Sequence, residues 1–509
     1  MKARGTAANS TSNESQGFFH PDSTLPRQRN YIGGGYRDAA SAGTFESRHP
    51  GNERVICEVE IAAREDVDRA VASAARAFET WSRKPGAERG RILQRAASIL
   101  RDRNEELAQL ETLDTGKPIG ETRAVDIITG VEVLEYFAGV AQSLHGHYVD
   151  LPPAAFAMIR REPVGVCAGI GAWNYPIQIA MWKSGPALAC GNTMVFKPAE
   201  QTPLTALKLA EIYTEAGMPD GVFNVVQGAS DTGAALVDHA GVAKITLTGS
   251  VETGKIVMAD SARTLKNVSL ELGGKSPLIV FADADFDNAL NAVLSANFYS
   301  SGQVCSNGTR VFVQRAIYED FVAALRGRTA AIRVGDPFDD ATQMGPLISR
   351  EHFEKVLSYV EAAKASPARH VVGGDTFDQG ALANGLYLSP AVFADCQDDM
   401  VFVREEVFGP LMAVLPFDDE EEVLRRANAT HYGLSGAVFS RDFARANRVA
   451  TSIQAGCVWI NDYNAVPPQI PFGGYKESGL GRENGLAAIE CYTQLKTIYA
   501  NLGDVPRVY

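Results

Sequence analysis

Apolar side chains between residues 60 and 140 recur at helical spacing. One set follows steps of three and four residues, which places its members on a single face of an α-helix: Val67, Ala70, Val71, Ala74 and Phe78. Glu65 and Asp66 precede this set, where acidic side chains stabilise the first turn of a helix. The pattern predicts a helix here and a second one over about residues 88–101.

From residue 164 the rhythm changes to short β-branched and apolar runs. These runs are separated by helix-like stretches, of which residues 203–217 begin with Pro203 and end at Gly217. The predicted strands are VGVCAGI, TMVF, FNVV, KITLT, VSLEL and LIVF. Alternation of strands and helices predicts a parallel sheet with helices on both faces.

The same alternation continues beyond residue 310, which predicts a second α/β lobe and a cleft between the two. TRVFVQ and MAVLPF are expected strands, and the segments after them, residues 317–332 and 420–430, are expected helices. Residues 491–502 form a further expected strand near the end of the chain. Such a terminal strand has a free edge, so we expect it to find a partner, for instance in another subunit.

Composition and charge exclude several classes of protein. The 509 residues are 45% hydrophobic and 21% charged, as in ordinary globular proteins, and the net charge of −13 disfavours nucleic acid and anionic membranes as partners. The first 30 residues are polar and lack the apolar core of a signal peptide, so we expect a loose leader. The longest uncharged run, residues 164–181, holds too many glycines and amides for a bilayer, and no transmembrane segment is expected.

The seven cysteines are scattered, without a CxxC pair. They suggest neither a disulfide framework nor a metal site, and reduced thiols in a cytoplasmic protein are the simplest interpretation. Cys305 differs from the others because it lies in SSGQVCSNGTR, a turn rich in glycine and serine just before a strand. A cleft-facing nucleophile and a structural thiol are about equally supported by that context.

A nucleotide site is indicated by three features of the first lobe. GIGAWN follows a strand directly, as a phosphate-binding turn does, although the third glycine of the dinucleotide fingerprint is missing. Lys197 and Glu200 follow the next strand, where a ribose would lie, unless they are a solvated charge pair. Gly249, Ser250 and Gly254 stand where a strand meets a helix, whose free N–H groups suit a pyrophosphate.

Two carboxylates stand at glycine turns. Glu271 ends the strand VSLEL just before GGKSP, which suits a general base, and its alternative role is a pair with Lys275. Glu406 and Phe408 precede Gly409 in REEVFGP, either as a surface turn or as a clamp on a ligand.

Taken together, the chain resembles the aldehyde dehydrogenase superfamily from about residue 30 to its end. The resemblance rests on ordered motifs: GAWNYP, FKPAEQTP, TGSVETG, LELGGKSP, GQVCSNGTR, REEVFGP and PFGGYKESGLGRENG. Leu247 and Val251 depart from the usual residues of the pyrophosphate motif, which should leave its backbone contacts intact.

The resemblance implies an α/β fold with two Rossmann-like parallel-sheet lobes and a small β oligomerisation element. Residues 1–30 would be the leader, 31–145 and 163–277 the NAD-binding domain, and 278–488 the catalytic domain. Residues 146–162 and 489–509 would bridge subunits of a homo-oligomer, a tetramer or a dimer.

The resemblance also assigns roles to residues. Cys305 would be the nucleophile, Glu271 the general base and Asn174 the oxyanion donor, while Lys183 and Glu483 would relay protons outward. No metal is expected, and the expected cofactor is NAD because Glu200 should repel the extra phosphate of NADP. The implied cofactor contacts are Ile170, Trp173, Lys197, Glu200, Gly249, Ser250, Gly254, Leu272, Glu406 and Phe408.

Within the superfamily, the likeness is to enzymes that oxidise betaine aldehyde and 4-trimethylaminobutyraldehyde. Tyr175, Trp182, Tyr299 and Tyr463 match positions of an aromatic cage for a quaternary ammonium, with core packing as the alternative. Betaine aldehyde is favoured by a small margin over the longer trimethylamino- or ω-aminoaldehydes. A CoA-acylating dehydrogenase is disfavoured by Glu271, and a non-catalytic scaffold by the presence of all three reacting groups.

Overall fold

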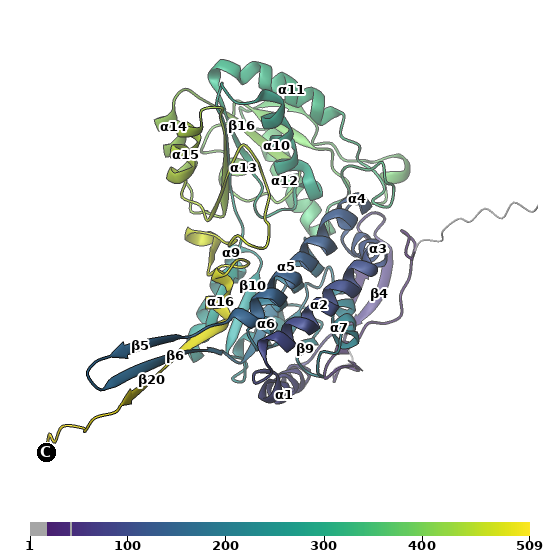
Figure 1. Ribbon diagram of the computed structural model, residues 1–509. Helices are drawn as coiled ribbons and strands as arrows, with labels where there is room; N and C mark the ends of the chain where they lie inside the picture. The colour runs from purple at the N-terminus through teal and green to yellow at the C-terminus, as the bar shows by residue number, and fades with distance from the viewer. Residues whose placement is uncertain (1–17, 41–42) are drawn as a thin grey trace, which may run out of the picture.

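Two predominantly parallel sheets form the frame of the protein in a computed structural model that describes residues 18–40 and 43–509 (Figure 1). The central strands β7, β8 and β9 of the first sheet are buried along their whole length, and β10 and β11 over most of theirs, as their apolar runs predict. Its order is β19 (Gly479–Leu480), β11 (Asn267–Glu271), β10 (Lys244–Thr248), β7 (Val166–Ile170), β8 (Thr193–Lys197), β9 (Phe223–Val225), β1 (Asn30–Tyr31) and β2 (Tyr36–Arg37).

Helices cover both faces of this first sheet, each with an apolar core beneath it. One core lies under α2 (Gly86–Asp102), α5 (Ile127–Val140), α6 (Pro176–Ala189) and α7 (Thr205–Glu215). The other lies under α1 (Arg64–Trp81), α8 (Ser230–Asp238) and α9 (Val251–Ser261). The helical face predicted for residues 67–78 is buried at Val67, Ala70, Val71 and Ala74.

The second sheet repeats the plan in the upper lobe of Figure 1. It is parallel except for its first strand, in the order β14 (Arg369–Val372), β15 (Ala391–Ala394), β16 (Leu411–Phe417), β13 (Arg310–Gln314), β12 (Pro277–Val280), β17 (Ser435–Phe439) and β18 (Cys457–Ile460). One core lies under α10 (Phe286–Phe298) and α11 (Tyr318–Ala330). The opposite core lies under α12 (Arg350–Lys364), α13 (Val401–Arg404), α14 (Glu420–Asn428) and α15 (Phe443–Ser452).

A three-stranded antiparallel sheet projects from the body as an arm (Figure 1). It consists of β5 (His147–Leu151), β6 (Ala155–Pro163) and β20 (Thr493–Asn501). β20 was expected to seek a partner, and it pairs along its full length with β6 of the same chain. It still lies at one edge of this sheet, so the pairing leaves its other edge open.

The remaining short elements connect the lobes or extend the first one. β3 (Thr44–Arg48) and β4 (Val55–Glu60) form a two-stranded sheet. The helical segments are α3 (Asn104–Thr115), α4 (Ile119–Glu121), the π-helical turn η1 (Thr122–Asp126), the 3₁₀ turn η4 (Tyr299–Gly302) and α16 (Ala487–Tyr492). Among the described residues, none of the helices combines the length and apolar character needed to cross a membrane.

The expected leader divides at residue 18. Residues 1–17 lie outside the described residues. The part from Phe18 to Asn30 is not loose, because the N–H groups of Leu25 and Gln28 donate to carbonyls of β4 and its Leu25 side chain packs on the core beneath that strand. The apolar residues of this segment, such as Phe19 and Leu25, are isolated in the sequence and follow no period. Their packing therefore could not be predicted from the sequence.

Candidate active site

The ends of three parallel strands bring the first candidate residues together. β10 ends at Thr248 and β11 at Glu271, which are paired in register, and β7 leads into the turn that carries Asn174. Parallel strands point their carboxyl ends to the same edge of a sheet, where ligands usually bind. Asn174 and Glu271 therefore lie at the same edge of the first sheet.

The loop that carries Cys305 is held in an unusual backbone conformation. Ser300, Ser301 and Gly302 all have positive φ, at 50°, 56° and 75°. A Cβ on Gly302 would lie 2.3 Å from the carbonyl oxygen of Gly409, so only glycine fits there. The turn thus presses the nucleophile loop against the entry to β16.

The two glycines after Glu271 each make room for another candidate residue. A Cβ on Gly273 would lie 2.0 Å from a carboxylate oxygen of Glu406, and one on Gly274 would lie 2.7 Å from the Cys305 carbonyl. The Gly274 N–H donates to Glu406 at 2.9 Å. The GG pair therefore lets Glu406 and the Cys305 loop of the second lobe approach the end of β11.

Two cavities meet at the candidate reacting groups. One has a volume of about 310 Å³ and the other about 360 Å³. Both are lined by Asn174, Thr248, Glu271 and Cys305. A group in either cavity therefore reaches the same thiol, amide and carboxylate.

The smaller cavity contains most of the expected cofactor contacts near the sheet edge. Those that line it are Trp173, Gly249, Ser250, Leu272, Glu406 and Phe408. α9 begins here, and its N-cap Ser250 accepts a hydrogen bond from the Thr253 N–H at 3.1 Å. The start of this helix supplies the partial positive charge that suits a pyrophosphate.

Four expected cofactor contacts lie outside this cavity. Ile170 and Lys197 are register partners at the ends of β7 and β8, and Lys197 donates to the carbonyls of Pro198 and Gly228. Glu200 is half-exposed, 3.8 Å from the Lys197 ammonium. Gly254 faces Leu272, whose side chain leaves no room for a Cβ there.

The second lobe adds lining residues that the sequence did not reveal. Ser349, Glu351, His352 and Lys355 come from the start of α12, and His352 donates to the Phe408 carbonyl at 2.7 Å. Burial lowers the pKa of His352 to about 4, so it is neutral. The sequence shows only a capped helix here, because the approach of α12 to the first lobe is a tertiary contact.

The larger cavity has aromatic walls. Tyr175, Trp182 and Tyr299 line it as expected, and Phe472 packs edge-on against Trp182 at 5.6 Å between ring centroids. Its polar lining includes Gln178, Asn464, Glu271 and Glu483. Further lining residues that the sequence did not single out are Val125, Thr129, Ile179, Ser295, Val304, Ser306 and Val466.

Tyr463 does not line this cavity, contrary to its expected place in a cage. Its hydroxyl donates to the Ser306 carbonyl at 2.5 Å, and its ring packs against Trp459 at 4.9 Å. The side chain supports the nucleophile loop from behind, and Asn464 takes the position on the wall. The alternation of side-chain direction in an irregular segment cannot be read from its sequence.

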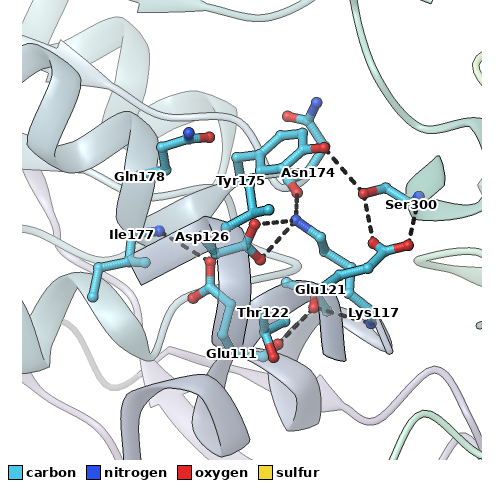
Figure 2. A network of polar contacts seen from close by, with 12 residues as sticks. Glu111, Lys117, Glu121, Thr122, Asp126, Asn174, Tyr175, Ile177, Gln178 and Ser300 are labelled. Atoms are coloured by element: carbon cyan, nitrogen blue, oxygen red, sulfur yellow. Dashed lines mark hydrogen bonds and ion pairs between the residues drawn. The ribbon is translucent and has the colours of Figure 1, made fainter. Parts of the chain in front are cut away.

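The ring of Tyr175 already has a cation on one face. Figure 2 shows the Lys117 ammonium beside it, 3.4 Å from the ring centroid. The Tyr175 hydroxyl is 3.0 Å from that of Ser300, whose N–H and hydroxyl both donate to Glu121. The wall of the larger cavity is therefore backed by a buried polar network.

Burial dominates the electrostatics of the reacting groups. It raises the pKa of the Cys305 thiol to about 12, and the nearby carboxylates of Glu406 and Glu271 contribute to the increase. Burial also raises the pKa of Glu271 well above its usual value, followed by the effect of Glu483. One Glu271 oxygen, Oε2, has no hydrogen-bond partner among the described residues. A thiol in this environment stays protonated until a base removes its proton.

A buried ion pair stands behind Glu271. The Lys183 ammonium lies 2.5 Å from Glu483 and donates to Thr246 at 3.2 Å. Glu483 also lines the larger cavity. The two residues expected to relay protons are thus in direct contact.

Comparison with known proteins places this geometry in a family. The model of the aldehyde dehydrogenase family matches residues 36–498. A crystal structure of betaine aldehyde dehydrogenase from Staphylococcus aureus in complex with NAD⁺ is 42% identical, with a TM-score of 0.93 over 95% of this chain and 96% of that one. An aldehyde dehydrogenase from Bacillus cereus is 42% identical, with a TM-score of 0.91 over 94% and 97%. The chain belongs to the aldehyde dehydrogenase family.

Proposed function

We propose that the protein oxidises betaine aldehyde to glycine betaine with NAD⁺, through a thiohemiacetal and a thioester on Cys305. The observation that carries this proposal is the lining of the larger cavity beside Cys305. It combines aromatic rings with two carboxylates, and its described lining residues include no lysine or arginine. Such a surface favours a cation that has no hydrogen-bond donors.

The residues of the smaller cavity fit a dinucleotide. The free N–H groups at the start of α9 suit its pyrophosphate, and Glu406 and Phe408 lie beside Cys305, where the reactive ring is needed. The solved relatives from Staphylococcus aureus in complex with NAD⁺ support this assignment. Residues 31–145 and 163–277 would then bind the cofactor, and residues 278–488 would supply the nucleophile.

The first half of the reaction uses the thiol and the amide. Glu271 takes the proton of Cys305, and the sulfur attacks the aldehyde carbon to form a tetrahedral adduct. The Asn174 side chain and the Cys305 N–H hold the oxyanion as it develops. NAD⁺, when bound, supplies the chemistry that removes hydride from this carbon.

The second half uses the same carboxylate on water. Glu271 deprotonates a water molecule that attacks the thioester carbonyl, which releases the carboxylic acid and restores the thiol. Its raised pKa suits this task, because a carboxylate with a higher pKa is a stronger base toward water. Lys183 and Glu483 lie behind it and would pass these protons onward.

A second candidate substrate class is favoured by the two amides in the same wall. Gln178 and Asn464 offer oxygen acceptors, which a primary ω-ammonium group would use and a quaternary ammonium would not. 4-Trimethylaminobutyraldehyde and ω-aminoaldehydes are therefore the alternative substrates.

A steady-state comparison of aldehydes tests the proposal. We expect kcat/KM for betaine aldehyde to exceed that for hexanal by about tenfold or more, since aromatic faces contribute about 0.5–2 kcal/mol each to binding a cation. 4-Trimethylaminobutyraldehyde and 4-aminobutyraldehyde complete the set. A preference for hexanal would contradict a cation site.

The variant Cys305→Ser is the control for the chemistry. It should abolish NADH formation with every aldehyde while it still binds NAD⁺ in a calorimetric titration, because the hydroxyl is a far weaker nucleophile than the thiolate. Normal turnover by this variant would remove Cys305 from the reaction.

A further inference from the structure

A buried ion pair lies beside the active site but outside both cavities. Lys117 follows Gly116, the left-handed residue that ends α3, and Asp126 ends the π-helical turn η1. Their side chains are 3% and 0% exposed, and the ammonium lies 2.7 Å from the carboxylate (Figure 2). Neither residue lines either of the two active-site cavities, so neither would touch a substrate or cofactor bound in them.

The ammonium of Lys117 also holds two consecutive residues of the first lobe. It donates to the main-chain carbonyl of Asn174 at 3.1 Å and lies over the Tyr175 ring. The position of the Lys117 ammonium is therefore fixed from three sides, by the Asp126 carboxylate, the Asn174 carbonyl and the Tyr175 ring. The turn that carries Asn174 is thereby held through both backbone and side chain.

This turn lies between two hydrogen-bond ladders. The N–H of Gly171 donates to Lys197 of β8, and the bonds of α6 begin with the Ile179 N–H to the Tyr175 carbonyl. Tyr175 itself has φ −141° and ψ 63°, which is neither strand nor helix. The backbone at Asn174 is therefore placed mainly by contacts from outside the turn, of which the Lys117 bond is one.

The side-chain amide of Asn174 has two N–H groups, one of which donates a hydrogen bond within the protein. Its Nδ2 donates to the Gln303 carbonyl, in the nucleophile loop, at 3.0 Å. The other hydrogen is the one that an oxyanion on Cys305 would need. The direction of this second N–H depends on the position of the Asn174 backbone, because the bond to Gln303 fixes the other end of the side chain.

We propose that Lys117, fixed by Asp126, is a positioning residue that aims the Asn174 amide at the oxyanion. A buried ion pair gives little net stability compared with apolar side chains of the same volume, so a pair at this place fits a positioning role. The role rests on the proposed function in one respect, the assignment of Asn174 as oxyanion donor.

A double-mutant cycle separates positioning from general support of the fold. Lys117→Met, Asn174→Ala and the double variant are compared with the unaltered chain in the cleavage of 4-nitrophenyl acetate. This activated ester needs no cofactor, and a nucleophilic thiol cleaves it through an oxyanion of the same kind. Its use keeps the test independent of which aldehyde is oxidised, and aldehyde oxidation is measured in parallel.

We expect Asn174→Ala to lower kcat by about 100- to 1,000-fold. Lys117→Met should lower it by about 10- to 100-fold, because a displacement near 1 Å has effects of this size. In the Asn174→Ala background, Lys117→Met should change kcat by less than about twofold, since both act through one amide. Equal factors in the two backgrounds, or no effect of Lys117→Met, would overturn the proposal.

Two further measurements keep the result specific. Alkylation of Cys305 by iodoacetamide forms no oxyanion, so its rate should be unchanged in Lys117→Met, whereas a generally damaged site would alter it. Glu111→Gln is the matched control, because Glu111 is fully buried in the same region and accepts a hydrogen bond from the Ile177 N–H, whereas Lys117 donates to Asn174. It should leave kcat within about twofold.

Loss of Lys117 alone leaves Asp126 as an unpaired buried charge, which can prevent folding. The variant Lys117→Met/Asp126→Leu removes both charges and is used in the same cycle in that case. The same loss of coupling with Asn174→Ala is expected from it. If no aldehyde is oxidised by the unaltered chain, the proposed function fails, while the ester cycle still decides the role of Lys117.

Discussion

The reactivity of Cys305 is governed by the carboxylates around it. Burial is the main reason for its raised pKa, and Glu406 is the next largest cause. Glu406 is itself buried, which raises its pKa to about 7. Above that pH its negative charge opposes formation of the thiolate.

Replacement of Glu406 by glutamine should therefore make Cys305 more reactive. Removal of the negative charge lowers the pKa of the thiol, which increases the thiolate fraction at any pH below that pKa. At pH 8 we expect the rate of iodoacetamide alkylation in Glu406→Gln to rise several-fold, measured by loss of free thiol, while binding of NAD⁺ weakens.

The neighbouring Glu405 supplies a matched control for this prediction. Its carboxylate accepts from the Tyr359 hydroxyl at the surface rather than facing the cavity. Glu405→Gln should leave the alkylation rate unchanged. An alkylation rate in Glu406→Gln at or below that of the unaltered chain would contradict the electrostatic explanation.

At the scale of elements, a strand positions the proposed base and a loop positions the proposed nucleophile. Glu271 stands at the end of a buried strand whose register is fixed by β10. Cys305 follows three residues of positive φ, a conformation that costs free energy and persists only because its surroundings enforce it. A Cβ would be more crowded at Gly302 than at Gly308, the other glycine of this loop.

Gly302→Ala should therefore disable the enzyme. The added methyl would collide with the Gly409 backbone, which displaces the loop and moves Cys305 away from Asn174. We expect a loss of kcat of at least about 100-fold from such a displacement, together with a lower melting temperature in a thermal scan.

Gly327→Ala is the control for the same substitution. Gly327 lies in α11, and a Cβ there would meet no atom within 4 Å. Alanine favours a helix over glycine by about 0.5–1 kcal/mol, so this variant should melt slightly higher and keep full activity. Full activity in Gly302→Ala would show that the loop tolerates the shift.

The elements show why some features were predictable from sequence and others were not. Periodic segments such as KITLT and VSLEL revealed their strands, and the motifs around Asn174, Glu271 and Cys305 revealed a shared site. The wall formed by α12 has no such signal, because it depends on how one lobe docks on the other. Tyr463 was misplaced because irregular backbone decides which way its side chain points.

For the whole molecule, the arm of β5, β6 and β20 is the feature that a single chain does not explain. It exposes Tyr148, Leu495 and Tyr499, which are 64%, 58% and 62% exposed. Tyr148 lies on one face of the sheet and Leu495 and Tyr499 on the other. Exposed apolar side chains on both faces of a projecting sheet with an open edge favour a contact with other copies. The expected homo-oligomer stays a prediction.

Leu495→Glu/Tyr499→Glu should weaken that association. Two buried charges in an apolar interface carry a large desolvation cost, so we expect a smaller species in sedimentation velocity at micromolar concentration. Leu265→Glu is the control, because Leu265 is 90% exposed on the body of the first lobe. A monomeric unaltered chain would refute the prediction.

The C-terminal segment links the arm to Glu271, the proposed base, by a short, continuous piece of chain. β19 pairs with β11 at Glu271, Glu483 lines the larger cavity, and α16 leads directly into β20 (Figure 1). A fusion partner or affinity tag appended after Tyr509 is thus attached to the same chain segment that pairs with β11 beside Glu271. A bulky fusion that displaces this segment would change the specific activity without any change in the reacting groups. A cleavable tag is therefore the better choice for kinetic work.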